Sequence, residues 1–456
     1  MTKNNIKDNI TNGTLEYVLN NNYLKRNIKK GTLNNGLKYV LNNDDTFKSC
    51  SVFIFVRVGS KHEKKEEYGM AHFLEHILFK GTKKYRTNLE LNRKIDSLSA
   101  TTNASTGKNF TCYFLKLPSI NTEEGIELLK EMVFFSILNN TELEKEKDVV
   151  IEEMNKSFDD SEEFIEDLLP SHIFKGTNLE HYIIGERDII NNMERKDIMK
   201  FYKKYYIPSN CTLVISGNFD KNLEIKLPKL LNFEIPGNSV KNSNSVNHNY
   251  ELCCYSKKMR VISDYRENYQ ITLGVAFPLF NYYDKRKYCL EILIAYLDGF
   301  LTSKLWLELR EKNPLVYDTD ASYELFEEGG IFQIVYSLEK RNVYKSLELV
   351  YKILEQLKKK KIKEEEFKMF QKNVIFNLDL QREDTSEICH FYGEQYLFNE
   401  DNVLTYEEVK KEYMKCTTDD IYDLVKFIFD YNKMVVIQMG DMNKKTFEKK
   451  VKKIFI

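Results

Sequence analysis

The sequence predicts an α+β protein made of two similar domains in tandem. The chain has 456 residues, which at about 100–200 residues per domain allows two to four domains. Strand-like and helix-like segments occur in a similar order before and after a polar stretch near the middle of the chain. Hydrophobic residues make up 42% of the chain, which is enough for sizeable cores and argues against wholesale disorder.

The first domain is expected at 26–231, after a polar, Asn-rich segment, 1–25, that we expect to be a flexible tail. Asn35–Gly36 lies between short apolar runs and indicates a hairpin turn. Thr141 is a possible N-cap of a helix predicted at Glu142–Ser157. Strands are expected at Ser51–Val58, Asn109–Leu117 and Thr212–Gly217, and helices at Gly69–Lys80, Leu89–Ser99, Glu123–Leu138 and Glu142–Ser157.

The stretch 232–250 is polar and contains Pro, Gly, Ser and Asn, so we interpret it as a linker. A second domain, 251–456, follows with a similar order of elements, which indicates an internal duplication. Its strands are expected at Ile271–Phe277, Gly330–Ser337 and Met434–Gly440, and its helices at Tyr288–Tyr296, Ser303–Glu311, Val343–Lys358 and Glu364–Leu378.

The charge balance excludes some classes of function. Lys and Arg total 68 and Asp and Glu total 69, which argues against a protein built around nucleic acid or an acidic membrane surface. No apolar run approaches a membrane span, and the N-terminus lacks a secretory signal. We therefore expect a soluble intracellular protein, with the cytoplasm preferred and the mitochondrial matrix as the alternative. The eight cysteines show no CxxC spacing and are expected to be reduced and structural.

The segment from His72 to His76, HFLEH, is the most informative motif. On a helix, His72 and His76 share one face and could bind one metal ion, with Glu75 beside the same point. Such a motif is expected by chance only about 0.01 times in a chain with this histidine content. The alternative is a pair of solvent-facing histidines, but the flanking residues are apolar, and burying these polar groups is costly unless a cation compensates. The motif therefore predicts a metal site that needs a third ligand from elsewhere.

HxxEH is the inverse of HExxH and is the inverzincin signature. Together with Gly59–Ser60, Gly69–His76 and Phe79–Thr82, it resembles the pitrilysin-type zinc metallopeptidases, in particular their processing-peptidase-like branch. The resemblance implies two homologous α/β domains in tandem, each an antiparallel-rich sheet packed by helices, that form half of a clamshell. The domain 26–231 would then be the metal-binding catalytic domain, and 251–456 a homologous domain without metal.

The resemblance also implies the third ligand, a glutamate seventy-odd residues downstream that follows another glutamate by seven positions. Glu153 and Glu146 match this pattern, with Glu153 as the ligand and Glu146 as a carboxylate that orients a ligand. Glu152 is the competitor, but it points about 100° away from the face that Glu146 and Glu153 share. A merely solvated acidic face is the alternative. The implied cofactor is one Zn²⁺ per chain, although two imidazoles and a carboxylate also bind Mn²⁺ or Co²⁺.

A site with two histidines and one glutamate leaves a coordination position open for water. Glu75 would take the proton of that water and later protonate the leaving amine. Asn103 and Ala104 resemble the family's substrate-binding edge strand, the alternative being an ordinary loop. Arg310 and Tyr317 resemble its Arg/Tyr pair, with Arg310 on a substrate carbonyl and Tyr317 donating to the oxyanion. The alternative is a capped helix end with a core tyrosine.

The expected function is that of a zinc-dependent endopeptidase acting on extended or unfolded polypeptides. One alternative is a mitochondrial presequence-cleaving subunit that needs a regulatory partner, and another is an inactive structural core subunit. The expected partners are a peptide or unfolded protein substrate and a second chain, in a homodimer or a heterodimer with a related chain. In such a dimer one protomer would supply the metal and the other the Arg/Tyr pair. No nucleic acid and no membrane span are expected.

Overall fold

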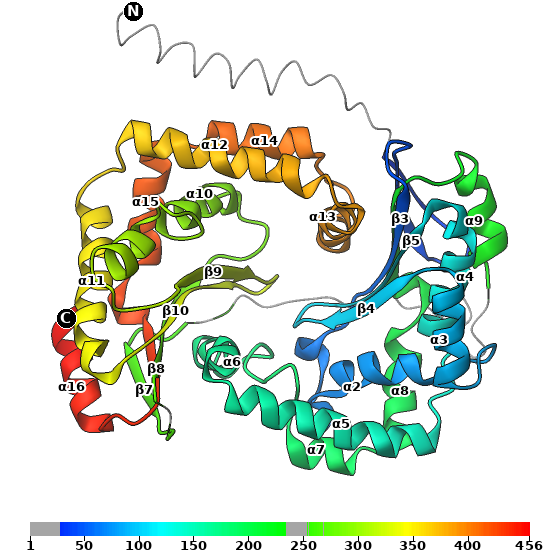
Figure 1. The fold of residues 1–456 in the computed structure, drawn as a ribbon, viewed down its shortest axis with the longest axis horizontal. Helices are drawn as coiled ribbons and strands as arrows, with labels where there is room; N and C mark the ends of the chain where they lie inside the picture. The colour runs from blue at the N-terminus through cyan, green and yellow to red at the C-terminus, as the bar shows by residue number, and fades with distance from the viewer. Residues whose placement is uncertain (1–27, 234–252, 254, 268) are drawn as a thin grey trace, which may run out of the picture. The chain divides into compact units, whose positions relative to one another are not determined.

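Two β-sheets organise the computed structural model, which describes residues 28–233, 253, 255–267 and 269–456. Each sheet and its helices form one unit of the chain (Figure 1). The first unit comprises 28–154, 181–233 and 379–407, and the second comprises the other described residues. The predicted tail, 1–25, lies outside the described residues, as does the predicted linker apart from Asn232 and Phe233.

The sheet of the first unit has six strands in the order β1-β2-β6-β3-β5-β4. The strands are β1 (Lys29–Thr32), β2 (Lys38–Asn43), β3 (Ser49–Val56), β4 (Thr101–Thr106), β5 (Thr111–Pro118) and β6 (Cys211–Gly217). Only the β2–β6 pair is parallel. The turn between β1 and β2 contains Asn35–Gly36 as predicted, and Gly36 adopts a φ of +87° that favours glycine.

The sheet of the second unit has five strands in the order β7-β11-β8-β10-β9. The strands are β7 (Arg260–Asp264), β8 (Ile271–Leu279), β9 (Asp320–Leu325), β10 (Gly330–Leu338) and β11 (Val435–Met439). Only the β7–β11 pair is parallel. When β1 is set aside, the two sheets have the same strand order and the same strand directions. This equivalence confirms the predicted α+β fold with two domains of one design.

Helices pack on both sheets, and their bounds follow the apolar patterns of the sequence. The helices assigned wholly or mainly to the first unit are α2 (Met70–Ile77), α3 (Asn88–Ser97), α4 (Thr122–Phe134), α5 (Asn140–Asp159), α7 (Arg187–Asn192), α8 (Arg195–Tyr205), α9 (Leu223–Leu231) and α13 (Thr385–Phe398). Those of the second unit are α6 (Ser161–Ile173), α10 (Lys287–Leu297), α11 (Val343–Lys359), α12 (Glu364–Gln381), α14 (Tyr406–Lys415), α15 (Thr418–Ile428) and α16 (Lys444–Phe455). No helix in the described ranges combines the length and apolar character that crossing a membrane requires.

Each unit includes a helix from the other half of the sequence. In the first unit α13 packs on β3 and β6, and in the second α6 packs on β8, β10 and β11 (Figure 1). Strand β3 is buried along almost its whole length, because α4 also packs against it. The predicted contiguous domains, 26–231 and 251–456, do not include this exchange of helices. Their boundaries stay a prediction from the order of elements.

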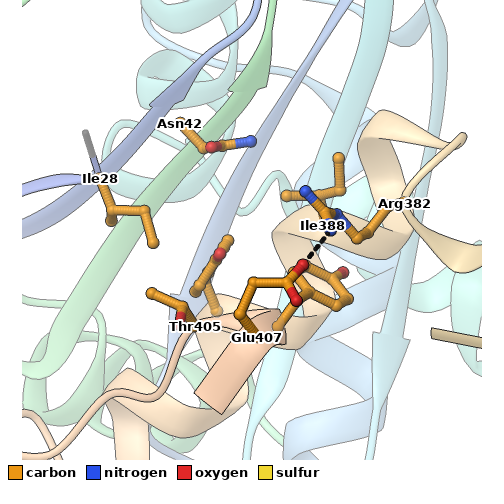
Figure 2. A pocket seen from close by; sticks show the side chains of 8 residues that line it. Ile28, Asn42, Arg382, Ile388, Thr405 and Glu407 are labelled. Carbon is orange, nitrogen blue, oxygen red and sulfur yellow. Dashed lines mark hydrogen bonds and ion pairs between the residues drawn. The ribbon is translucent and has the colours of Figure 1, made fainter. Parts of the chain in front are cut away.

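A small cavity marks where the segment 379–407 joins the first unit. It has a volume of about 20 Å³, close to the space one water molecule needs, and lies beside Ile28 and Asn42. Figure 2 shows Arg382 and Glu407 facing each other at this cavity, with 3.0 Å between Arg382 Nη1 and Glu407 Oε1. The hydroxyl of Tyr406, a residue that is 4% exposed, has no protein partner there. A single bound water would satisfy it.

Two local expectations need correction. Thr141 does not cap α5, because the helix begins at Asn140 and the Asn139 side chain accepts the Thr141 N–H at 2.8 Å. The cysteines are not all reduced, since Cys289 and Cys416 form a disulfide with their Cα atoms 5.7 Å apart. These two residues are 127 positions apart, so their proximity is tertiary and the spacing of the cysteines could not reveal it. Cys50, Cys112, Cys211 and Cys389 are buried free thiols.

We predict that Gly393→Ala destabilises the protein by about 1–3 kcal/mol, although alanine favours helices. A Cβ atom at Gly393 of α13 would lie 2.1 Å from the Phe55 ring of β3. That ring is fully buried, so a shift of the ring would disturb the packing around it. Gly107→Ala is the matched control, because its Cβ atom would meet only one carbonyl oxygen, at 3.7 Å. Urea unfolding followed by circular dichroism measures both variants, and equal midpoints would contradict close packing of α13 on β3.

Candidate metal centre

The helix α2 carries His72, Glu75 and His76 because its other face is apolar. Phe73, Leu74 and Ile77 are buried, so the two imidazoles and the carboxylate lie on the opposite, partly exposed side. The helix follows Gly69, whose φ is +90°. A Cβ atom at Gly69 would also lie 2.8 Å from the Ile184 carbonyl oxygen, so both conformation and space favour glycine at this position.

Glu63 fixes the N-terminus of α2. Its buried carboxylate accepts the backbone N–H groups of Gly69 at 2.9 Å and Ala71 at 2.7 Å. Nε2 of His181 lies 3.5 Å from the same carboxylate and 2.6 Å from the Ser60 carbonyl oxygen. A carboxylate suits the positive end of a helix dipole, so Glu63 satisfies otherwise unpaired N–H groups and orients the helix. The sequence motifs single out neither Glu63 nor His181.

The side chains of His72, His76 and Glu153 converge at one point. One ligand atom from each lies within 4.8 Å of the other two. Nε2 of His76 lies 3.1 Å from Glu153 Oε2, and Nε2 of His72 lies 3.8 Å from Glu153 Oε1. Glu153 comes from α5, so the site joins two helices that are distant in the sequence. The carboxylate in this group belongs to Glu153 and not to its neighbour Glu152.

Burial and neighbouring charges set different protonation tendencies for the two histidines. Burial, together with His76, lowers the pKa of His72 to about 4, so this imidazole is neutral at pH 7. Burial alone would also lower the pKa of His76, but hydrogen bonds with Glu146 and Glu153 outweigh it and raise the pKa to about 9. In the metal-free protein, a proton on His76 therefore supplies positive charge between two carboxylates.

Glu146 supports His76 from the side away from Glu153. Nδ1 of His76 lies 3.0 Å from Glu146 Oε1, and Nζ of Lys80 lies 2.7 Å from Glu146 Oε2. The Glu146 side chain is only 4% exposed. Burial favours the neutral carboxyl, but the hydrogen bonds from His76 and Lys80 outweigh it and lower the pKa of Glu146. Glu146 is thus a buried carboxylate that fixes the orientation of the His76 ring.

Glu75 lies beside the converging group and takes a hydrogen bond from the sheet. The hydroxyl of Thr106 on β4 donates to Glu75 Oε2 at 2.5 Å. Burial raises the pKa of Glu75, and the Thr106 hydrogen bond and His76 partly offset that effect. Sequence reasoning missed Thr106. No local pattern separates it from the other threonines of the chain.

Asn103 and Ala104 lie on β4, which is an edge strand of the first sheet and not a loop. Asn103 is exposed and Ala104 is buried, as alternation on a strand requires. The same strand carries Thr106, so a chain segment that paired with β4 would run past Glu75. Peptide binding by Asn103 and Ala104 stays a prediction.

Arg310 and Tyr317 lie together in the second unit. Arg310 belongs to a π-helix, Trp306–Glu311, within the helix that was predicted at Ser303–Glu311. Its guanidinium carbon lies 4.0 Å from the centre of the Trp306 ring and 5.0 Å from that of Tyr317. Tyr317 is 82% exposed, so the alternative reading of a core tyrosine is wrong. The roles of Arg310 and Tyr317 toward a substrate stay predictions.

Comparisons with known sequences identify relatives of this chain. The model of the insulinase family, peptidase family M16, matches residues 38–187, and the model of the M16 inactive domain matches 192–374. An uncharacterized zinc protease, YmxG, of Bacillus subtilis is 25% identical over 400 residues, covering 87% of this chain and 95% of the relative. An uncharacterized zinc protease of Rickettsia felis is 26% identical over 396 residues, covering 84% of this chain and 90% of the relative.

Solved structures share the fold at lower sequence identity. A protease from Helicobacter pylori superposes with a TM-score of 0.85 at 21% identity, covering 91% of this chain and all of the other. A peptidase M16 inactive domain from Pseudomonas fluorescens gives a TM-score of 0.82 at 15% identity, covering 91% of this chain and 98% of the other. The two family matches together span most of residues 38–374 and include every residue of the converging group. The chain belongs to the M16 family of peptidases, as its resemblance to pitrilysin-type enzymes implied.

Proposed function

We propose that this protein is a zinc-dependent endopeptidase that hydrolyses extended or unfolded polypeptides. The observation that carries the proposal is the convergence of His72, His76 and Glu153 beside the carboxylate of Glu75. The names of the relatives in Bacillus and Rickettsia, both called zinc proteases, agree with it. Metal binding and hydrolysis by this chain are both part of the proposal.

The donor set fits a zinc ion. Two imidazoles and one carboxylate, all within 4.8 Å of one another, form the ligand set of many catalytic zinc sites. With Nδ1 of His76 donating its proton to Glu146, the Nε2 lone pair is left for a cation. When bound, Zn²⁺ would act as a Lewis acid that polarises a carbonyl group and makes water more acidic.

The residues of the chain would then perform the proton transfers. Glu75 would accept a proton from the attacking water as the new C–O bond forms at the peptide carbonyl carbon. It would return that proton to the amide nitrogen as the C–N bond breaks, so that an acid and an amine leave. Burial raises the pKa of Glu75 toward the working pH, which suits a group that must both take and give a proton. Thr106 would hold this carboxylate in position.

The position of strand β4 at an edge of its sheet supports extended polypeptides as the proposed substrates. A sheet edge binds a peptide through backbone hydrogen bonds that depend little on sequence, and Asn103 and Ala104 lie on this edge. Arg310 and Tyr317 would add a substrate contact and an oxyanion donor. We propose that a second copy of this chain, or a related chain, brings such a pair to the metal centre, since one chain carries both sets of residues.

We predict that Glu75→Gln lowers kcat on a quenched, unstructured peptide by about 10²–10⁴-fold, because glutamine cannot accept the proton. Bound zinc should be unchanged, since Glu75 is not in the converging group. Hydrolysis kinetics and metal analysis of both proteins check this. Glu66→Gln, at an exposed position nearby, is the control. An active Glu75→Gln protein would remove Glu75 from the mechanism, and an inactive wild type that retains zinc would overturn the proposed activity.

Glu153→Gln should weaken zinc binding by at least about 100-fold, because outer carboxylates alone contribute about 10–100-fold. Glu152→Gln, one position along the same helix, should leave the affinity unchanged. Competition with a chromophoric chelator measures both variants. Equal losses, or a loss confined to Glu152→Gln, would show that the third ligand has been assigned to the wrong residue.

Thr106→Val should lower kcat by about 10–100-fold with little change in KM, because it removes a hydrogen bond to a charged group. Thr106→Ser keeps the hydroxyl and should restore most of the rate. Steady-state kinetics on one peptide separates the two parameters. If KM rose while kcat stayed constant, Thr106 would serve substrate binding on β4 and would not position Glu75.

A further inference from the structure

Helix α16 lies at the surface of the second unit, with one of its faces buried. Phe447, Val451 and Phe455, spaced four residues apart, form the buried row. The helix packs on α11 and on β7, which belong to the same unit (Figure 1). The ring of Phe447 contacts that of Tyr344 and the ring of Phe455 contacts that of Tyr351, with centres 6.4 Å and 5.5 Å apart. These contacts with α11 fix the orientation of α16 and turn its opposite face away from the core of the unit.

That opposite face carries a row of lysines. Lys445, Lys449 and Lys453 are exposed, are also spaced four residues apart, and lie about 200° around the helix from the buried row. Residues at this spacing are neighbours on a helix surface. Within the described ranges, none of the three belongs to an ion pair. The row is therefore a line of positive charge that no carboxylate compensates.

Other lysines of the second unit are arranged differently. Lys312, Lys368 and Lys415 each form an ion pair with a glutamate three or four residues earlier in the sequence. Among the described lysines of α16, only Lys452 has such a partner, which is Glu448. Like charges four residues apart destabilise a helix, so the lysine row is unfavourable in the free protein. A negatively charged partner would relieve that repulsion.

Helix α11 extends the positive surface. Lys345 and Lys352 of this helix are exposed, with the exposed carboxylate of Glu348 between them. Nζ of Lys450 lies 4.0 Å from the centre of the Tyr344 ring and so connects the two helices. The surface of α11 and α16 is therefore strongly positive, although the whole chain has a net charge of −1.

We propose that this surface of α11 and α16 docks on an anionic lipid bilayer. Two features favour a bilayer over a nucleic acid or an acidic protein segment. Helix α16 carries lysines and no arginine, and lysine acts as a point charge that suits a diffuse negative potential, whereas arginine suits planar, bidentate recognition of single phosphates and carboxylates.

The second feature is an apolar side chain among the lysines. Ile456 directly follows α16, is 80% exposed, and lies three residues from Lys453 and four from Lys452. At a bilayer such a side chain can enter the boundary between headgroups and acyl chains, while beside a nucleic acid it would stay in water. The apolar and cationic groups of this face therefore match the two layers of a membrane surface.

Docking on a bilayer would be independent of the metal centre and of the proposed hydrolysis. It would add a place of action to the protein and would need no segment that crosses the membrane. The attraction between lysines and anionic headgroups extends over one Debye length, about 8 Å at physiological salt, so the attachment should be reversible and sensitive to salt.

Flotation of the full-length protein with vesicles tests the proposal. One set of vesicles consists of phosphatidylcholine alone, and a second set contains about 30% phosphatidylserine. We expect partition onto the anionic vesicles to exceed partition onto the neutral ones by at least about 10-fold at low salt, and to be lost in about 0.5 M salt. Equal partition onto both sets of vesicles would overturn the proposal.

A triple variant assigns the binding to α16. Lys445→Gln, Lys449→Gln and Lys453→Gln together should lower the partition coefficient about 100-fold, because each lysine near an anionic surface contributes about 5-fold. Circular dichroism verifies that the variant is folded. Unchanged partition of the folded variant would overturn the assignment to this face.

The matched control removes the same amount of charge elsewhere in the second unit. Lys175→Gln, Lys285→Gln and Lys411→Gln change three exposed lysines outside α11 and α16 and should leave the partition coefficient unchanged. Equal losses in both triple variants would show that net charge, and not this surface, causes the binding, and would overturn the proposal.

Two other polyanions test the class of partner. Duplex DNA and poly-glutamate are titrated at the same ionic strength, with fluorescence anisotropy as the readout. If either one bound while the anionic vesicles did not, the partner would belong to another class and the bilayer assignment would fail. Vesicle binding by a wild-type protein without peptidase activity would overturn the proposed function and leave the docking surface standing.

Discussion

The candidate site depends on the close approach of α2 and α5. Two imidazoles and two carboxylates from these helices lie within a few ångströms of one another, and burying such groups is costly unless their charges are balanced. In the protein without metal, a proton on His76 supplies part of that balance. A divalent cation would supply it more completely, with His76 deprotonated and Glu153 as a ligand. With such a cation bound, the same geometry would serve both stability and chemistry.

The surrounding structure holds the two helices in this arrangement. Glu63 fixes the start of α2, and Gly69 permits the tight approach of the neighbouring loop at Ile184. Lys80, on the turn after α2, forms an ion pair with Glu146 of α5 and so connects the two helices directly. The second unit repeats the strand order, but α10, which follows β8 as α2 follows β3, carries no histidine. Within the described residues, the duplicated framework therefore brings together a group that could hold a metal ion in the first unit and not in the second.

Much of the fold was predictable because local sequence patterns determine it. The apolar run at β3, the helical spacing at α2 and the Asn35–Gly36 turn each determine their element from neighbouring residues. The exchange of α6 and α13 was not predictable, because it depends on contacts between residues hundreds of positions apart, such as Gly393 with Phe55. The disulfide between Cys289 and Cys416 escaped prediction for the same reason.

The residues of the candidate site also fall into those that local sequence patterns predict and those that they do not. His72, Glu75 and His76 lie on one helix, so their spacing alone brings them together. Glu153 required a resemblance to a family, since the residues alone gave an acidic helix with several candidates. Thr106 reaches the site only through tertiary structure, from the sheet edge, whereas Glu63 contacts the start of α2 from the segment just before that helix. Neither carries a local signal that separates it from the other glutamates and threonines of the chain.

X-ray absorption at the zinc K-edge tests the central claim most directly, namely that His72, His76 and Glu153 hold one metal ion. The purified full-length chain would be loaded with one equivalent of zinc, desalted and compared with His72→Ala prepared in the same way. The account predicts two imidazole ligands and oxygen ligands at about 2.0–2.2 Å in the wild type, with no sulfur scatterer and fewer imidazoles in the variant. Sulfur ligation, an unchanged imidazole count in His72→Ala, or loss of zinc from the wild type on desalting would contradict it.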